Sequence, residues 1–570
     1  MVDAGKILEP VTQLAQRRTQ PLILELDLTE GLIEGAPADP VSAVLGMRRP
    51  RLQDVLDGLK RARDDDRVKA LVAKVGGKPI GFGAVQELRA AIRAFGDAGK
   101  LTIAWAETFG EFGPGTVPYY LATAFARIAL QPSGDVVITG VAMEEKFLRG
   151  TLDKLDVKWE VGQRHEYKTA VNTFTQEGFT EPHREADERL VASLGEQIVA
   201  GVAESRRLDA ADVRSLIDRA PLLADEALEA GLVDRLAYRD QIYDDVRDTV
   251  SAGADGEARL LYVGRYNRAH ALGSRIPKPR ENVVALVRLS GGIRLGRSGR
   301  GPVSGGGAGS DTIAGALRAA INDDKVSAIV LRVNSPGGSY VASDVIWREV
   351  VRAHQAGKPV IVSMADVAAS GGYFVAMGAD AIVAQPGTLT GSIGVFGGKP
   401  VVGDLLARLG VSWDTVRQGA RGGMFSTSTP FTEDEWSRVN GWLDRIYTDF
   451  TTKAAQGRGL TRERVHELAR GRVWTGEDAK ERGLVDHLGG LDLAASLARK
   501  KAGLAADAPL RPYPHVSPLE RLRPPESSED RTAARAAIRL EMWGPLADMA
   551  VRAGLPLGGP LMLPSRYEIR

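Results

Sequence analysis

The amino-acid sequence predicts an α/β protein built from two homologous domains in tandem. The chain has 570 residues, more than one ordinary hydrophobic core accommodates. Similar stretches also recur in the same order about 250 residues later: DDDRVKALVAKV from Asp64 matches NDDKVSAIVLRV from Asn322, and DEALEAGLVDRL from Asp225 matches EDAKERGLVDHL from Glu477. The shared order and spacing indicate an internal duplication.

The sequence pattern also predicts that strands and helices alternate within each copy. In the second copy, β-branched runs predict strands at 282–289, 328–333, 359–364 and 381–385, and helical patterns fill 311–324 and 343–357. Because parallel strands are joined through crossover helices, this alternation predicts a mostly parallel sheet in each domain.

Changes in composition place the domain boundaries. Residues 1–250 are expected to form the first domain and 280–500 the second, joined by a linker at 251–279 that is polar and lacks a clear period. The remainder, 501–570, begins as a proline-rich tail, and a short amphipathic helix is expected at 531–551.

Charge and cysteine content exclude several function classes. The formal net charge is +1, so the chain as a whole has no electrostatic preference for nucleic acid. It has no cysteine, which rules out disulfides, thiolate metal sites and thiol catalysis. Neither a secretory signal nor a transmembrane segment is recognisable, so we expect a protein that is cytoplasmic or peripheral to the cytoplasmic membrane.

A single serine stands on a turn that is typical of a nucleophile. In MADVAASGGYFVAMGAD, residues 364–380, Ser370 follows a predicted buried strand and precedes two glycines and an apolar, helix-like run. A second loop, VNSPGGSY at 333–340, follows the preceding strand and carries Gly337 and Gly338. If the two strands are neighbours, N–H groups of these glycines and of Gly371 could form an oxyanion hole beside the hydroxyl.

The base for this serine is not found nearby. No histidine occurs between Gly371 and Val465, whereas a nucleophilic hydroxyl requires a group that takes its proton. A lysine can serve when burial keeps it neutral. The first copy has Thr116 at the position of Ser370 and GGKPI in place of NSPGG, so only the second copy is equipped to attack a carbonyl.

The segments VNSPGG, KPVIVSMADVAASGGYFVA and TLTGSIGVFG closely resemble the signal peptide peptidase A (protease IV) family of serine proteases. This resemblance extends over roughly residues 20–500 and matches the family's long, duplicated form. It implies two tandem crotonase/Clp-protease-like domains of ββα repeats and a Ser/Lys dyad. The family's lysine motif resembles EYKTAVNTFT at 166–175, which makes Lys168 of the first copy the base for Ser370.

The resemblance also implies the remaining features of the site and its substrates. Ser392, in TLTGSIGV, would orient the lysine amine, and Glu166 is expected to point away because a carboxylate beside the amine would raise its pKa. Substrates would be apolar peptides, including signal-peptide remnants, cleaved through an acyl-enzyme. No metal or cofactor is implied, and the assembly would be a homotetramer with possible peripheral membrane contact.

Three alternatives remain open from the sequence. A crotonase-type acyl-CoA hydratase or isomerase would use glycine N–H groups against an enolate with glutamates as acid and base, but no glutamate occurs between Glu349 and Glu433. A Clp-type peptidase would need a histidine, which the gap after Ser370 argues against. The third is a non-catalytic scaffold of the same fold.

Overall fold

The computed structural model describes residues 20–34, 49–252, 258–273, 282–299, 307–514 and 561–562. The chain divides into two compact units. Unit 1 comprises the described residues within Met1–Ala142 and Leu194–Lys278, and unit 2 those within Met143–Ser193 and Pro279–Glu568.

Unit 1 contains a six-stranded sheet in which every neighbouring pair is parallel. Its strands, in spatial order, are β8 (Arg235–Leu236), β4 (Arg127–Leu130), β3 (Leu101–Ala106), β2 (Val68–Lys74), β1 (Leu22–Asp27) and β9 (Arg259–Tyr262). A further pair joins β5 (Asp135–Val136) to β7 (Leu222–Leu223). The helices are α3 (Leu52–Arg63), α4 (Phe82–Asp97), α5 (Thr116–Ala122), α9 (Ala210–Arg219), α10 (Ala224–Glu229), α11 (Arg239–Ser251), α12 (Val263–Gly273) and the C-terminal part of α8 (Glu181–Arg206).

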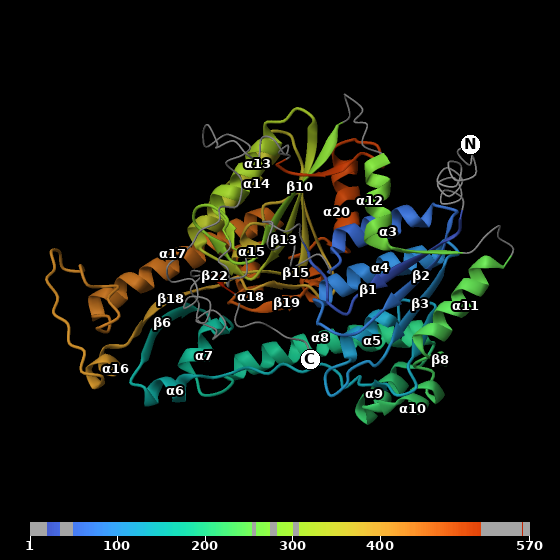
Figure 1. The fold of residues 1–570 in the computed structure, drawn as a ribbon. Coiled ribbons are helices and arrows are strands. Elements are labelled where there is room, and N and C mark those ends of the chain that lie inside the picture. Colours follow the sequence, from blue (N-terminus) through green and yellow to red (C-terminus); the bar gives the residue numbers. More distant parts are fainter. Residues whose placement is uncertain are drawn as a thin grey trace, which may run out of the picture. The chain divides into compact units, whose positions relative to one another are not determined.

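The strands of unit 1 are buried on both faces, as expected for a parallel sheet. Along β1, Leu22 and Leu24 belong to a core with α3 and α4, while Ile23 belongs to a second core with α11. The alternation of these side chains explains why the strands are continuous apolar runs in the sequence. Figure 1 shows α11 and the pair α3 and α4 around this sheet.

Unit 2 is built on a second, larger sheet. Its main path is β19 (Val473–Thr475), β17 (Leu389–Gly391), β15 (Val360–Ala369), β13 (Val326–Ser335), β10 (Val283–Ser290) and β21 (Leu510–Pro512), and β16 (Ala381–Ala384) and β20 (His487–Leu488) branch from β15. All pairs are parallel except β17 with β19.

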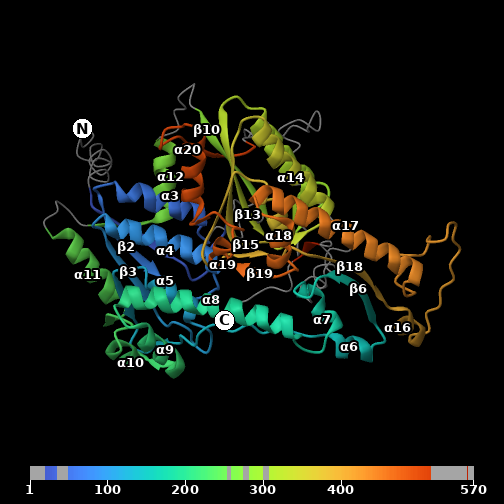
Figure 2. The same cartoon turned by 180° about the vertical axis from the view of Figure 1, so that it is seen from behind.

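Helices cover both faces of this sheet (Figure 2). On one face the core includes side chains of α13 (Ser310–Ile321), α14 (Tyr340–Gln355), α15 (Gly371–Phe374), α17 (Glu433–Arg458), α18 (Arg462–Leu468) and α19 (Gly476–Glu481). On the other face α20 (Leu491–Lys501) packs through Leu491, Ala494 and Ala498. The remaining helical segments of unit 2 are α6 (Arg149–Lys154), η1 (Thr169–Val171), α7 (Asn172–Thr175) and α16 (Gly403–Arg408).

Two small sheets complete unit 2. The antiparallel pair of β6 (Lys158–Arg164) and β18 (Val395–Val401) joins a segment of the first sequence copy to the second copy. The other sheet has the order β12 (Ala308–Gly309), β11 (Ile293–Arg294), β14 (Gly337–Gly338) and β22 (Leu561–Met562). In the sequence, β6 ends shortly before Lys168, β18 begins shortly after Ser392, and β14 consists of Gly337 and Gly338.

The structure confirms the α/β prediction and the four expected strands of the second copy. The helix expected at 343–357 begins earlier, at Tyr340, because the Ser339 hydroxyl accepts a hydrogen bond from the Ala342 N–H and caps it. Among the described helices, none combines the length and hydropathy that crossing a bilayer requires.

The units differ from the sequence-based boundaries in two places. Residues 143–193 belong to unit 2 although they precede residue 250, because β6 pairs with β18. The expected linker at 251–279 contains β9 and α12, and β9 adds to the edge of the unit 1 sheet beside β1. The helix expected at 531–551 lies outside the described residues.

Candidate active site

Ser370 lies at the carboxyl end of β15, on the turn that leads into α15. Its backbone has φ 54° and ψ −115°, a sparsely populated combination for a residue with a side chain. Two backbone hydrogen bonds hold the turn: the Ser370 N–H donates to the Gly391 carbonyl at 2.8 Å, and the Phe374 N–H donates to the Ser370 carbonyl at 2.8 Å. The hydroxyl is therefore fixed at the end of a buried strand.

Lys168 approaches Ser370 within unit 2. Its Nζ lies 2.9 Å from Ser370 Oγ, 2.8 Å from Ser392 Oγ and 3.1 Å from the Ser392 carbonyl oxygen. The side chain is completely buried, and Ser370 and Ser392 are buried as well. The structure thus brings together the three side chains that the sequence analysis named, across more than two hundred residues of chain.

Burial determines the protonation of this lysine. Loss of solvent lowers the pKa of the Lys168 ammonium well below its ordinary value of 10.5, because the charged form cannot be hydrated. The carboxylate of the neighbouring Glu166 forms an ion pair with Arg470. This agrees with the expectation that Glu166 points away from the amine. The three hydrogen-bond partners of the amine are neutral oxygens, so none of them supplies a negative charge that would offset the loss of hydration.

Ser392 follows β17 and is held in a strained backbone conformation of its own. Its φ is 50°, and its N–H donates to the Arg472 carbonyl at 2.7 Å. Because β17 pairs with β15, the strand that ends at Ser370, both serines come from neighbouring strands of one rigid sheet. Their hydroxyls therefore fix the lysine amine from two directions.

The two glycine loops also meet, as expected, because β13 and β15 are adjacent and parallel. A Cβ built on Gly371 would lie 3.1 Å from the Gly338 nitrogen and 3.2 Å from the Gly337 Cα. Gly337 donates its N–H to Ser335 Oγ at 3.2 Å, which holds the loop in place. Gly338 has φ 152°, and a Cβ there would lie 2.0 Å from the Ile293 carbonyl oxygen, so only glycine fits.

Gly337 and Gly338 also form the short strand β14. In this conformation they pair with Ile293 of β11 on one side and, antiparallel, with Leu561–Met562 of β22 on the other. The backbone next to the serine turn can therefore accept an extended chain segment as an additional strand.

One further residue of the site was not found from the sequence. Gly471, just before β19, has φ 90°, and a Cβ there would lie 2.4–2.5 Å from the Lys168 N, Cα and Cβ atoms. Gly471 therefore allows the lysine backbone to reach its position. A lone glycine among the chain's 65 carries no signal of this contact, which joins residues far apart in sequence.

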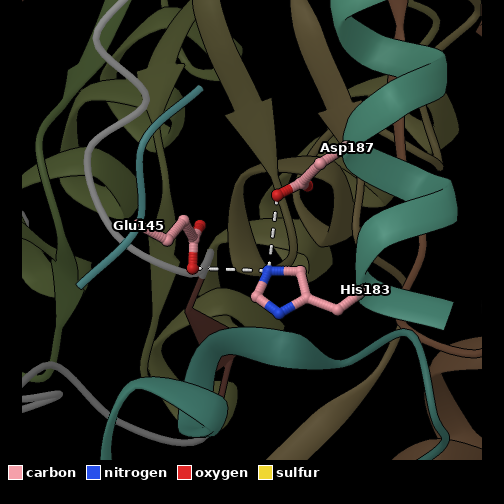
Figure 3. A group of neighbouring side chains, drawn as sticks. All are labelled: Glu145, His183 and Asp187. Atoms are coloured by element: carbon pink, nitrogen blue, oxygen red, sulfur yellow. Dashed lines mark ion pairs between the residues drawn. The ribbon is translucent and has the colours of Figure 1, made fainter. Parts of the chain in front are cut away.

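Metal-ligating side chains gather at a second place in unit 2. Within the described part of the chain, one group of three or more such residues has donor atoms within 4.8 Å of one another: Glu145, His183 and Asp187 (Figure 3). The sequence carries no signal of this group, because Glu145 is far in sequence from the helix that carries the other two.

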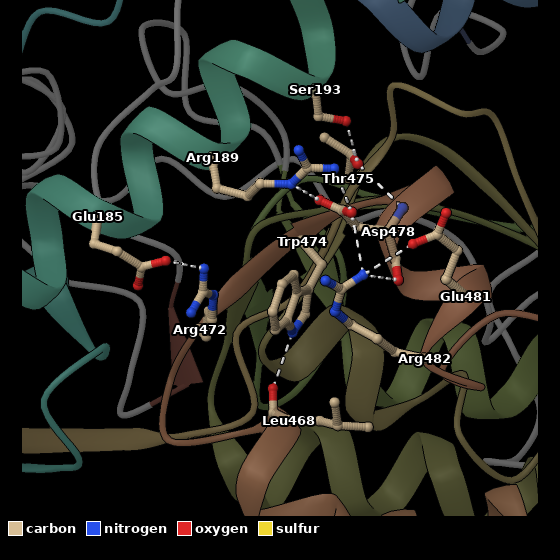
Figure 4. Close-up of polar contacts among 10 residues, drawn as sticks. All are labelled: Glu185, Arg189, Ser193, Leu468, Arg472, Trp474, Thr475, Asp478, Glu481 and Arg482. Carbon is tan, nitrogen blue, oxygen red and sulfur yellow. Dashed lines mark hydrogen bonds and ion pairs between the residues drawn. The ribbon is translucent and has the colours of Figure 1, made fainter. Parts of the chain in front are cut away.

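The segment that carries Lys168 is also anchored on its C-terminal side, through α8 (Figure 4). Arg189 makes a bidentate ion pair with the buried Asp478 at 2.9 and 3.1 Å, and Ser193 Oγ lies 2.9 Å from Thr475 Oγ1. Together with the β6–β18 pair, these contacts hold both ends of 158–193 against the part of unit 2 that carries the serine.

Comparison with known proteins identifies related sequences. The family model described as "Peptidase family S49" matches residues 94–252 and 352–505, one match in each sequence copy. Protease 4 of Salmonella typhi is 32% identical over 81% of this chain and 74% of its own length. The chloroplastic serine protease SPPA of Arabidopsis thaliana is 29% identical over 80% of this chain and 66% of its own length.

Solved structures with similar regions include two proteases. ClpP1 from Listeria monocytogenes, in a mutant form, shares 14% identity over 37% of this chain and 94% of that chain, with a TM-score of 0.23. A mutant of the 1510-N membrane-bound stomatin-specific protease, in complex with a substrate peptide, shares 18% identity over 42% of this chain and 96% of that chain, with a TM-score of 0.26.

Proposed function

We propose that this chain, which belongs to peptidase family S49, a family of serine peptidases, hydrolyses peptide bonds with Ser370 as nucleophile and Lys168 as general base. The observation that carries the proposal is the 2.9 Å contact between Lys168 Nζ and Ser370 Oγ in a fully buried site. A nucleophile within hydrogen-bonding reach of a neutral base is the arrangement that covalent catalysis requires.

The reaction follows from this contact. The neutral amine of Lys168 takes the proton from Ser370 as its oxygen attacks the scissile carbonyl carbon. Lys168 then gives this proton to the leaving amine, and an acyl-enzyme ester remains on Ser370. Water, activated by the same amine, attacks the ester and releases the second product. Ser392 holds the amine toward Ser370 throughout.

The negative charge that develops on the substrate oxygen requires donors. We assign this role to the backbone N–H groups of Gly338 and Gly371, which lie side by side at the ends of two adjacent strands. Gly337, whose N–H donates to Ser335 Oγ, would instead shape the loop.

The backbone pairing of Gly337 and Gly338 favours a peptide over an acyl-CoA thioester as substrate. Gly337 and Gly338 pair antiparallel with Leu561–Met562 of β22. A peptide backbone could take the position of β22 and pair with the two glycines in the same way. An acyl-CoA hydratase would also require carboxylates as acid and base, whereas the group hydrogen-bonded to the serine is an amine.

The proposal is tested with the purified full-length chain, a fluorogenic apolar peptide and an acyl-CoA. We expect cleavage of the peptide and, after rapid acid quenching, an acyl adduct on the tryptic peptide that contains Ser370. Turnover of the acyl-CoA without peptide cleavage would contradict the proposal. So would peptide cleavage at an undiminished rate by Ser370→Ala.

The pH dependence follows from the lowered pKa of Lys168. The amine acts as a base only when neutral, so kcat/KM should rise with pH as Lys168 loses its proton and reach a plateau well below pH 10.5. The measurement is kcat/KM across the pH range with an uncharged peptide. An activity that rises only around the pKa of an exposed lysine would contradict a neutral, buried amine.

Removal of the Ser392 hydroxyl should weaken catalysis without preventing binding. Ser392→Ala deletes one hydrogen bond of 2.8 Å to the amine, and we expect kcat to fall about tenfold with little change in KM. The matched control is Ser205→Ala, which deletes a hydroxyl of unit 1 that donates to the Gly201 carbonyl at 2.7 Å. Equal losses in kcat for the two variants would contradict the proposal that Ser392 orients the Lys168 amine.

Family resemblance supports finer proposals on substrate and assembly. Apolar peptides, including signal-peptide remnants, are the proposed substrates, and the proposed assembly is a homotetramer. Peptide libraries of graded hydropathy test the first, and light scattering of the purified chain tests the second. Membrane fractionation followed by a high-salt wash tests whether the enzyme binds the bilayer peripherally.

A further inference from the structure

We propose that Glu145, His183 and Asp187 bind a divalent transition-metal ion of the zinc type, at a site that does not include Ser370 or Lys168. All three residues lie within Met143–Ser193 of unit 2, the segment that also supplies Lys168. Figure 3 shows both carboxylates directed at the same nitrogen of the imidazole ring.

The distances fit a cation between the side chains. His183 Nε2 lies 3.3 Å from Glu145 Oε2 and 3.4 Å from Asp187 Oδ2. A charge-assisted hydrogen bond between a ring N–H and a carboxylate would be shorter, about 2.7–2.9 Å. Donors bound to one tetrahedral zinc at about 2.0–2.2 Å lie roughly 3.3–3.5 Å apart, which matches the two distances from His183 Nε2 to the carboxylates.

The cluster is buried, and two of its donor atoms have no hydrogen-bond partner within the described residues. The side chains of His183, Asp187 and Glu145 are 0%, 9% and 4% exposed. Within the described residues, His183 Nε2 and Asp187 Oδ2 make no hydrogen bond. A divalent cation would compensate both the carboxylates and the imidazole lone pair.

The surroundings of His183 suit a metal ligand. The Asn172 side-chain amide lies 3.3 Å from His183 Nδ1. The amide atom at this distance is Nδ2; with the amide turned by 180°, which exchanges its nitrogen and oxygen, Asn172 would accept the Nδ1 proton and leave the lone pair on Nε2 for a cation. The rings of Phe147 and Phe179 pack edge-on to the imidazole, with centroids at 6.1 and 4.9 Å, and provide an apolar shell.

The donor set indicates the class of metal. One imidazole nitrogen and two carboxylates, with no cysteine in the chain, suit zinc and its neighbours better than magnesium or calcium, which prefer oxygen ligands alone. Three protein donors leave a fourth position for water in a tetrahedral site.

The metal would have a structural role for the lysine segment. His183 and Asp187 stand one turn apart on α8, Glu145 lies in the loop before α6, and Asn172 begins α7. A cation would join these segments on either side of Lys168 in the sequence. It would touch neither the amine nor the serine, so binding is measurable independently of peptide hydrolysis.

The test uses the tag-free, full-length chain after treatment with a chelator, titrated with Co²⁺ and Zn²⁺. We expect about one Co²⁺ per chain with the visible d–d absorption of a tetrahedral nitrogen–oxygen site, and displacement of Co²⁺ by Zn²⁺. Asp187→Asn and His183→Gln should abolish this signal. Asn172→Ala should weaken affinity roughly 10–100-fold, because it removes only the residue that orients the ring.

A surface pair provides the matched control. His354 Nδ1 lies 3.1 Å from Asp380 Oδ1 at an exposed position, and the described residues offer no third ligand there, so His354→Gln should leave the cobalt stoichiometry unchanged. If the variants of the buried cluster fail to fold, metal binding by the wild-type chain alone tests the proposal. Zn²⁺ should then raise its melting temperature after chelation, since a ligand of the native state stabilises it. Absence of Co²⁺ and Zn²⁺ binding by the folded wild-type chain, or equal binding by folded Asp187→Asn, would overturn the proposal and leave a buried histidine–carboxylate group.

Discussion

Replacement of Lys168 by methionine is expected to reduce kcat for peptide hydrolysis by at least about 10⁴-fold, with a much smaller effect on KM. Among the described residues, the Lys168 amine is the side-chain group that is hydrogen-bonded to Ser370 Oγ. Methionine fills a similar volume in the buried site but cannot accept the proton. The measurement is steady-state kinetics with a fluorogenic peptide.

The effect should be non-additive with that of Ser370→Ala. If the two side chains act as a unit, the double variant loses no more activity than either single variant. Lys358→Met is the matched control, because burial also lowers the pKa of Lys358, while its amine donates to the Ala320 and Asp323 carbonyls. Activity of Lys168→Met within tenfold of wild type would exclude the lysine as base.

The serine side of the site could be predicted from the sequence because its geometry is local. A buried strand, a glycine-containing turn and the alternation of strands with helices place Ser370 and the Gly337–Gly338 loop at the ends of neighbouring parallel strands. The rules of α/β topology then bring the loops together without further information.

The lysine side required the resemblance. Lys168 reaches Ser370 because β6 pairs with β18 and α8 is anchored to α19, and both contacts join segments more than two hundred residues apart. Periodicity reports which face of an element is buried but not which distant segment covers it. For the same reason, residues 143–193 were assigned to the first domain by position, whereas their contacts are with unit 2.

The two elements inside the expected linker at 251–279, β9 and α12, were not predicted from the sequence for a different reason. The strand β9 has four residues, Arg259–Tyr262, and α12 follows it at Val263 without an intervening turn. A strand this short cannot establish a period of two, and the charged residues of α12 reduce the contrast between its faces. The helix α12 is held by tertiary packing of its buried residues Val263 and Tyr266, which the local sequence pattern does not reveal.

Gly471→Ala tests whether the position of the lysine backbone, and not only its amine, determines the rate. A Cβ at Gly471 would lie 2.4 Å from the Lys168 nitrogen and 2.5 Å from its Cα and Cβ, so the lysine must move by up to about 1 Å to reach ordinary contact distance. A displacement of that size in a catalytic group costs on the order of 100-fold in rate. We therefore expect kcat to fall about 100-fold, although the substituted residue lies outside the dyad.

Backbone strain must be separated from displacement, because alanine at φ 90° destabilises the chain by itself, by about 1–2 kcal/mol. Gly483→Ala provides this separation. Gly483 has φ 75°, and the nearest atom to its added Cβ is Leu460 Cδ2 at 3.9 Å, so the variant has similar strain without a collision. Both variants should lower the melting temperature, and only Gly471→Ala should lower kcat. Equal kcat values for the two folded variants would show that the Lys168 backbone does not depend on the glycine beside it.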